Sequence, residues 1–128
     1  VIGLSWYPWW HGGLDALAGA VDRLRGVAPV WVVESAYPFT LGWDDATHNP
    51  VGTAEHVALG PPATPAGQAA WFEAIADTLR DRADALFVWE PAWLAGADPG
   101  SPWENLAWYD FEGRRLPVWE VLPEETRR

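Results

Sequence analysis

The sequence contains neither cysteine nor methionine. Without cysteine, disulfides and thiolate metal sites are excluded, and the redox compartment cannot be inferred from composition. Positive charge is also scarce, since 8 Lys and Arg residues face 18 Asp and Glu residues and the formal net charge is −10. Long-range attraction to phosphate backbones or anionic membranes is therefore not expected. The composition predicts neither a nucleic-acid-binding nor a membrane-binding protein.

Long apolar segments are missing as well. No apolar run approaches the roughly 20 residues of a membrane-spanning helix, and no charged start with an apolar signal core opens the chain. Because the chain begins at Val1 rather than at a methionine, we expect a processed or truncated N-terminus, with room for a secretory signal upstream. The 128 residues make at most one ordinary domain, well short of the roughly 250 residues of a typical eight-fold barrel.

Tryptophan is unusually frequent, with 11 residues among the 128. Its side chain is large and flat with a single donor, so it either packs in a core or offers a platform for the apolar face of a ligand. A single tryptophan is more typical of a core, but strand-to-loop junctions are where α/β proteins build their sites, and clusters there favour ligand contacts. The clusters at such junctions are Trp6, Tyr7, Trp9 and Trp10; Trp89 and Trp93; and Trp103, Trp108 and Tyr109.

The apolar pattern alternates between strands and helices. It predicts strand 1–5, helix 14–24, strand 30–33, helix 65–83 and strand 85–89, with an aperiodic loop over residues 40–63. Gly26 is placed to end the first helix, and Thr64 followed by Pro65 is typical of a helix start. The unbroken apolar runs suit parallel strands covered on both faces. The order of elements therefore predicts a parallel α/β sheet.

Two of the predicted strands run directly into an acid. Glu34 follows "VWVV" and Glu90 follows "ALFVW". Because the carboxyl ends of parallel strands face the active site in such folds, we expect both carboxylates at the functional rim. A single acid at such a point is more typical of a loop cap or of an ion pair with arginine. Two acids in equivalent positions, each beside aromatic residues and proline, favour a site.

Five segments of the chain are similar, in unbroken order, to a known family. They are "IGLSWYPWWHG", "VVESAYPFT", "ATPAGQAAWF", "FVWEPAW" and "WENLAWYDFEGRRLP". Together they resemble the C-terminal half of the arabinogalactan endo-β-1,4-galactanases, glycoside hydrolase family 53. The resemblance implies a partial TIM (β/α)₈ barrel in which residues 1–128 are the C-terminal part of the catalytic domain and supply the last three β/α units, strands six to eight. It also implies a retaining glycosidase acting on β-1,4-galactan or type I arabinogalactan, the pectin side chain, and secretion is usual for this family.

The resemblance assigns roles to individual residues. Glu34 matches the nucleophile at the end of the seventh strand, which attacks the anomeric carbon and forms a glycosyl-enzyme intermediate. Tyr7 is a candidate phenol that holds this carboxylate, Trp89 matches the aromatic floor beside the cleaved bond, and His11 is a candidate donor to a sugar hydroxyl. A packed rim tyrosine and a solvated loop histidine remain alternatives for Tyr7 and His11. The candidate substrate-binding residues are Tyr7, Trp9, His11, Trp89 and Trp93.

The proton donor is the missing part of this chemistry. A retaining glycosidase needs two carboxyl groups about 5 to 5.5 Å apart. In the family resembled, the acid/base is a glutamate after the fourth strand, and the first five β/α units have no counterpart in this chain. We therefore expect the acid/base in a missing N-terminal half. A Glu34–Glu90 pair, in which repulsion would raise one pKa, is a fallback ranked below a structural role for Glu90.

An open three-stranded sheet predicts dependence on a partner. It would leave unpaired edges and an uncovered apolar face, which favour association. We expect the chain to require the N-terminal barrel half or self-association, and to be inactive as an isolated monomer. A second hypothesis is a non-catalytic galactan-binding or interaction fragment, in which aromatic clusters bind sugar faces and the acids are incidental.

Two departures from the family concern hydroxyl and metal chemistry. Trp6 stands where the family's usual "SYYP" segment has tyrosine, so a hydroxyl role at that position is in doubt. Some bacterial members bind calcium in the loop after the seventh strand, and "GWDDATHNPVG" offers oxygen and nitrogen ligands here. Alternating ligand spacing is absent, so we predict no metal or cofactor and prefer a polar loop folded on Asx turns, with calcium as the alternative. The candidate calcium ligands are Asp44, Asp45, His48 and Asn49.

Overall fold

The computed structural model describes residues 1–95 and 100–121. Its three strands form one parallel sheet in the order β1-β2-β3, so the predicted parallel α/β sheet is confirmed. The strands are β1 (Ile2–Ser5), β2 (Val30–Glu34) and β3 (Ala85–Leu86). Ile2 pairs with Val30 at the start of β2, and Val32 pairs with Leu86 on its other side. The central strand β2 therefore lies between two strands that each have one open edge in the described part of the chain.

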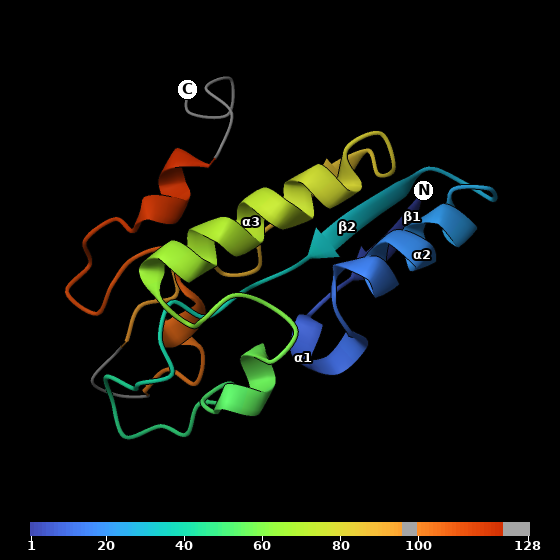
Figure 1. Cartoon of the computed structure of the whole chain (residues 1–128). Helices are drawn as coiled ribbons and strands as arrows, with labels where there is room; N and C mark the ends of the chain where they lie inside the picture. Colours follow the sequence, from blue (N-terminus) through green and yellow to red (C-terminus); the bar gives the residue numbers. More distant parts are fainter. Residues whose placement is uncertain (96–99, 122–128) are drawn as a thin grey trace.

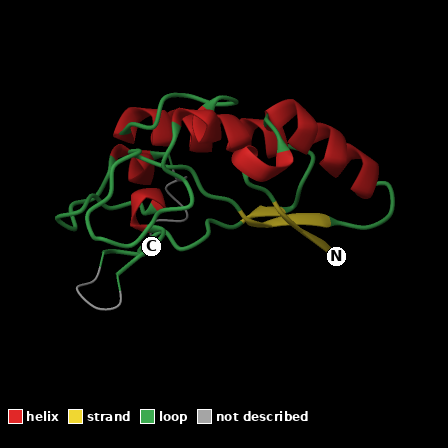
Figure 2. Cartoon of the chain, turned by 90° about the horizontal axis from the view of Figure 1, so that it is seen from below, coloured by secondary structure: helices red, strands yellow, loops and turns green. Residues whose placement is uncertain are grey.

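The helices lie on one side of this sheet. Figure 1 shows α2 and α3 running alongside the strands, and Figure 2 shows the long helices as one layer, with short helical turns and most loops gathered beyond one end of the strands. The α-helices are α1 (Pro8–His11), α2 (Leu14–Leu24) and α3 (Pro65–Leu79), and the 3-10 helices are η1 (Ala54–Val57), η2 (Glu104–Leu106) and η3 (Pro117–Glu120). No helix in the described residues is both long and apolar enough to span a membrane.

Helix α2 forms because its apolar residues recur on one face. Leu17 and Val21, four positions apart, are completely buried, and each such burial contributes about 1.5–3 kcal/mol to stability. The helix ends at Leu24, whose carbonyl accepts from the amides of Val27 and Ala28 at 2.8 and 3.2 Å. The helix thus ends just before Gly26, as predicted, although Gly26 does not take the left-handed φ typical of such a position.

Helix α3 begins as predicted and ends earlier than predicted. The hydroxyl of Thr64 accepts from the amide of Gly67 at 3.0 Å, and Pro65 is the first helical residue. The helix stops at Leu79 rather than near Ala83, because Arg80 takes an extended ψ of 128° and Asp81 then takes a left-handed φ of 60°. The turn that follows leads directly into β3.

The two faces of β2 differ in cover. Val30 and Val32 are completely buried against the helical side, whereas Trp31 and Val33 on the other face are exposed. Phe87 is also exposed, and its ring lies 5.9 Å from that of Trp31. The sequence predicted cover on both faces, but within the described residues only the helical face is covered. A parallel sheet with helices on one side and an apolar second face is consistent with part of a barrel.

A register shift at the end of β2 sets the direction of Glu34. Leu4 pairs with Val32 but Ser5 pairs with Glu34, so Val33 is an extra residue in β2. Strict alternation would place Glu34 on the same face as Val30 and Val32. A bulge of this kind breaks the alternation and re-aims the side chain that follows.

The predicted strand 85–89 is shorter than expected. Strand β3 ends at Leu86, although the amides of Phe87 and Trp89 still bond to the carbonyls of Val32 and Ser35 at 2.8 and 2.9 Å. Glu90 therefore does not end a strand; it follows this segment in a left-handed conformation with a φ of 47°. The predicted equivalence of Glu34 and Glu90 was wrong.

Buried amide side chains hold the segment that follows β2. The Nδ2 of Asn105 donates to the carbonyls of Thr40 and Val51 at 3.1 and 2.6 Å. The Nε2 of Gln68 donates to the carbonyls of Tyr37 and Ala107 at 2.8 and 2.9 Å. Because buried carbonyls need donors, these two amides fix the loops at the carboxyl end of the sheet.

Candidate active site

A cavity of about 210 Å³ lies at the carboxyl end of β2. It is mostly apolar, with one acid and one phenol in its wall, which is the composition typical of small-ligand sites. Four of the predicted site residues, Glu34, Tyr7, Trp9 and Trp89, meet in it. The lining residues are Tyr7, Trp9, Trp10, Glu34, Trp89, Trp103 and Leu106.

Glu34 is positioned by its backbone and by one hydrogen bond. Its carbonyl accepts from the amide of Trp6 at 2.8 Å, and its Oε2 accepts from the hydroxyl of Tyr7 at 2.8 Å. The side chain is half-buried, and no arginine in the described residues forms an ion pair with it. Oε1 of this carboxylate is thus left for another partner in the cavity.

Tyr7 is held as a neutral donor. Burial raises the pKa of its phenol well above the ordinary value of 10, and the hydrogen bond to Glu34 and the negative charge of Glu34 raise it further. Its ring is buried among aromatic neighbours, with Trp9 and Trp10 at centroid distances of 5.4 and 5.3 Å and Trp89 at 6.4 Å. The phenol therefore stays protonated, and its O–H donates a hydrogen bond to the carboxylate across the neutral pH range.

Three of the four indoles that line the cavity pack edge-on against one another. Trp103 lies edge-on to Trp89, with centroids 5.4 Å apart, and edge-on to Trp10 at 6.4 Å. Trp10 is 59% exposed, so one part of its ring is open to a ligand. Trp10 and Trp103 belonged to the aromatic clusters but were not among the predicted site residues, and Leu106 gave no sequence signal at all.

Two predicted substrate contacts lie outside the cavity lining. The Nδ1 of His11 accepts from the amide of Tyr7 at 3.0 Å, so only its Nε2 can reach a ligand. Trp93 packs on Trp89, with centroids 5.5 Å apart and ring planes 31° apart. Their contacts with a sugar stay predictions.

Glu90 is separate from the acid in the cavity. It is exposed, does not line the cavity that contains Glu34, and its carbonyl accepts from the amide of Trp93 at 3.2 Å. The geometry gives the fallback pair of Glu34 and Glu90 no support. The turn that begins at Glu90 instead positions Trp93 to pack on Trp89.

The candidate calcium loop uses its polar groups internally. The two carboxylate oxygens of Asp45 accept from the amides of Thr47 and Ser101 at 2.6 Å each, and these bonds lower the pKa of Asp45. The Asp45–Thr47 bond is the expected Asx turn. Asn49 is buried and donates to Oε1 of Glu104 at 3.1 Å. Over residues 1–95 and 100–121 no three acidic or histidine side chains group as metal ligands, and calcium binding stays untested.

Comparison with known proteins identifies the relatives of the chain. Residues 1–122 match the family model described as Glycosyl hydrolase family 53. The chain is 37% identical to a protein of Niallia circulans described as "Uncharacterized protein in bgaB 5'region", over 95% of this chain and 36% of that protein. It is 35% identical to the arabinogalactan endo-beta-1,4-galactanase of Cellvibrio japonicus (strain Ueda107), over 86% of this chain and 31% of that protein.

A solved structure shares the fold. The Ignisphaera aggregans GH53 catalytic domain superposes with a TM-score of 0.86 at 33% identity, over 94% of this chain and 37% of that domain. The chain thus spans little more than a third of the length of its relatives.

Proposed function

The chain belongs to glycosyl hydrolase family 53, and from this premise we propose that it is the nucleophile-bearing part of a retaining endo-β-1,4-galactanase. Its substrate in this proposal is β-1,4-galactan or type I arabinogalactan. The residues correspond to the sixth, seventh and eighth β/α units of the barrel. The name of the Cellvibrio japonicus relative supports galactan as the substrate, and the position of Glu34 in the cavity supports its role as nucleophile.

One observation supports the catalytic role best. A carboxylate without a cationic partner in the described residues, Glu34, accepts a 2.8 Å hydrogen bond from a buried phenol inside a cavity walled by tryptophan. An acid kept only for stability at this position would be expected to pair with an arginine or to lie in solvent. The apolar face of a galactose ring, made of C–H groups, fits an indole wall such as Trp89.

The proposed reaction has two steps. A carboxylate oxygen of Glu34 forms a bond to the anomeric carbon while the bond from that carbon to the leaving oxygen breaks, and the leaving oxygen takes a proton from the general acid. Water then attacks the anomeric carbon and gives its proton to the former general acid, which now acts as the base. The bond to Glu34 breaks, and the anomeric carbon keeps its original configuration. The hydrogen bond from Tyr7 holds Oε2 throughout, which orients Oε1 toward the sugar.

The general acid belongs, in this proposal, to the part of the protein that this chain does not include. Two carboxyl groups about 5 to 5.5 Å apart are needed, and Glu34 is the only acid that lines the cavity in the described residues. The exposed face of β2, with Trp31 and Val33, and the open edges of the sheet are the surfaces that the missing barrel units would cover. The isolated chain is accordingly expected to release no sugar.

The test uses the full-length protein that carries these residues. Glu34→Ala should lower release of reducing ends from β-1,4-galactan by at least about a thousand-fold, because a covalent step is lost. Added azide should restore turnover and yield the α-galactosyl azide, since a small anion can attack from the side that the carboxylate vacates. Binding of the variant to galactan should persist.

Glu90→Ala is the matched control, because Glu90 is an acid close to Trp89 that lies outside the cavity. It should keep turnover within a few-fold of the parent. Full turnover by Glu34→Ala, or loss of turnover only in Glu90→Ala, would refute the assignment of the nucleophile. Galactan binding with no hydrolysis by the parent protein would instead support the non-catalytic hypothesis.

A further inference from the structure

Three tryptophans in the described residues are strongly exposed, and two of them are accounted for. Trp10 lines the cavity, and Trp31 lies on the open face of the sheet beside Phe87. Trp43 belongs to neither surface. It is 45% exposed on the loop that follows β2, where neither the fold nor the cavity requires an indole.

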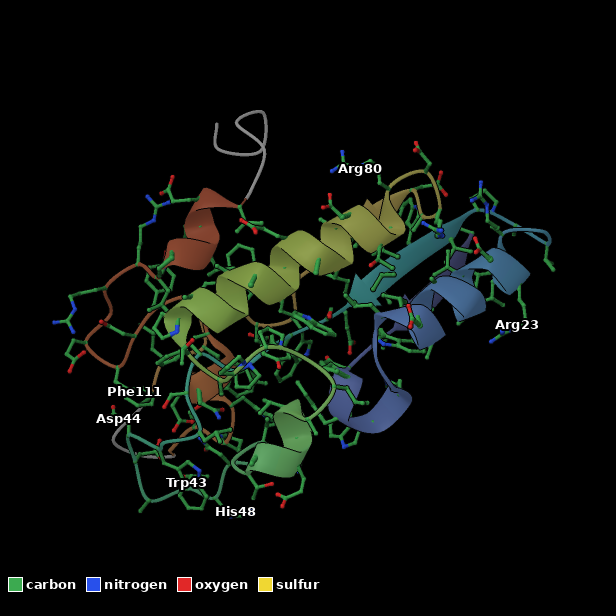
Figure 3. All side chains as sticks on the ribbon, viewed as in Figure 1. Arg23, Trp43, Asp44, His48, Arg80 and Phe111 are labelled. Atoms are coloured by element: carbon green, nitrogen blue, oxygen red, sulfur yellow. The ribbon has the colours of Figure 1, made fainter. Side chains whose placement is uncertain are left out.

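The indole of Trp43 is supported on two sides. His48 meets it edge-on, with ring centroids 5.0 Å apart and planes at 89°. A Cβ on Gly52 would lie only 3.0 Å from its Nε1, so even a methyl group at Gly52 would press on the ring. Figure 3 shows Trp43 and His48 beside each other at the outer end of this loop.

The loop that presents this ring is fixed in place. Oε1 of the buried Glu104 accepts from the amide of Asp44 at 3.3 Å and from Asn49 at 3.1 Å. Asp45 ties the same loop to the amide of Ser101 at 2.6 Å. An exposed ring on a preorganised loop loses little entropy on binding a ligand.

The same contacts connect Trp43 to the catalytic cavity. Glu104 is the first residue of η2, whose last residue, Leu106, lines the cavity, as does the adjoining Trp103. A volume of about 210 Å³ is small for a polymer, since drug-sized ligands occupy roughly 300–1,000 Å³. An endo-acting enzyme therefore needs surface beyond the cavity to bind the rest of its chain.

We propose that Trp43, with His48 at its edge, is a second sugar-binding platform that binds β-1,4-galactan outside the catalytic cavity. The indole face stacks on the C–H face of a galactose ring, and the imidazole of His48 bonds a hydroxyl of that sugar. This inference rests on the proposed function for its ligand. It gives the loop a role in binding polymer that is separate from bond cleavage.

The experiment compares long and short substrates in the full-length protein. Trp43→Ala should raise KM for polymeric β-1,4-galactan about tenfold, the effect of losing one stacked ring, while kcat and the kinetics on β-1,4-galactotetraose stay unchanged. Trp43→Phe should recover most of the polymer KM. Leu59→Ala, which trims another exposed apolar side chain (60% exposed), is the matched control and should change neither substrate.

The outcomes separate this inference from the proposed function. Equal effects of Trp43→Ala on both substrates, or no effect on either, would overturn the platform while leaving the assignment of Glu34 intact. If the parent protein hydrolyses no galactan, mobility of parent and Trp43→Ala in galactan-containing gels decides the matter. Weaker retardation of Trp43→Ala, with an unchanged melting temperature, then supports the platform, and equal retardation rejects it.

Discussion

At the amino end of the sheet, Asp22 lies within 3.8 Å of Arg25 and 3.5 Å of Arg82, and all three side chains are at least a third exposed. At the carboxyl end, Glu34 has a phenol for a partner and indoles around it, with no arginine nearby in the described residues. Arg23 and Arg80 also lie toward the amino end in Figure 3, far from the loop of Trp43. The same residue types thus lie in solvent beside opposite charges at one end, and in an aromatic cavity without a cationic partner at the other, which is the arrangement that the proposed function needs.

Cavity size does not distinguish these two ends. The hollow at the amino end, lined by Arg25, Arg82 and Asp84 among others, has a volume of about 400 Å³, larger than the 210 Å³ at Glu34. Its walls are exposed turns, and its two arginines, Arg25 and Arg82, both already lie close to the carboxylate of Asp22. The smaller cavity contains the phenol with the raised pKa, and that combination of burial and specific contact is what marks a site.

Among the variants that test this comparison, Tyr7→Phe should have the largest effect, because it asks whether the carboxyl end depends on its phenol. A hydrogen bond to a charged group contributes about 1.5–3 kcal/mol, so kcat/KM on galactan should fall about 10- to 100-fold. Tyr109→Phe is the control, because Tyr109 packs on Trp119 away from the cavity. An unchanged kcat/KM in Tyr7→Phe would show that Glu34 needs no such partner.

The pH dependence of the parent enzyme follows from the same contact. The raised pKa of Tyr7 means that its hydrogen bond is fully present below about pH 10, its unfolded value, and is lost only as pH rises further. Tyr7 should therefore impose no alkaline decline on kcat/KM below that pH.

An intermediate effect is expected from relieving backbone strain at both ends. Glu90 and Asp81 are the two non-glycine residues with positive φ in the described part of the chain, one at each end of the sheet. Glycine removes a left-handed penalty of about 1–2 kcal/mol at some entropic cost, so each of Glu90→Gly and Asp81→Gly should stabilise by about 0.5–1 kcal/mol. Thermal unfolding measures this.

Activity should separate those two variants. Glu90→Gly loosens the turn that holds Trp93 on Trp89, so it should lower kcat/KM a few-fold, whereas Asp81→Gly should leave kcat/KM unchanged. A loss of activity in Asp81→Gly would mean that the amino end of the sheet is coupled to catalysis and is not only a solvated surface.

The smallest effect is expected from Asp22→Asn. Exposed ion pairs contribute up to about 1 kcal/mol and often nothing measurable, so stability should fall by less than about 0.5 kcal/mol, and less still in 1 M salt. Turnover should match that of the parent. A large loss of stability would show that the amino end is more than a solvated surface.

The sequence predicted the elements better than it predicted their ends. The 3.6-residue period placed α2, and the cap at Thr64 placed the start of α3, because both signals are local. The end of α3 depended on a turn at Arg80 and Asp81, which nothing in the composition of that segment demands. Strand β3 was overextended because an apolar run continues past the residues that actually pair.

The site was predictable to the extent that its residues are chemically unusual. Glu34, Tyr7, Trp9 and Trp89 lie together as expected, because the carboxyl ends of parallel strands meet at one edge of the sheet and several such residues follow them. Leu106 could not be predicted as a site residue, because it is an ordinary leucine that lines the cavity only through the position of η2. The hydrogen bonds of Asn105 and Gln68 to distant carbonyls depend on tertiary structure, which no local pattern encodes.

The extra residue in β2 has a practical consequence for anyone who joins this three-stranded segment to a different N-terminal partner. Removing one valine from "VWVVE" would preserve the hydrophobicity of the segment almost entirely. It would also remove the bulge opposite Ser5, whose local twist sets how the acid meets Tyr7 and the indoles, so turnover should fall although the sheet still forms. The spacing from Val30 to Glu34 therefore has to be conserved as strictly as the acid itself.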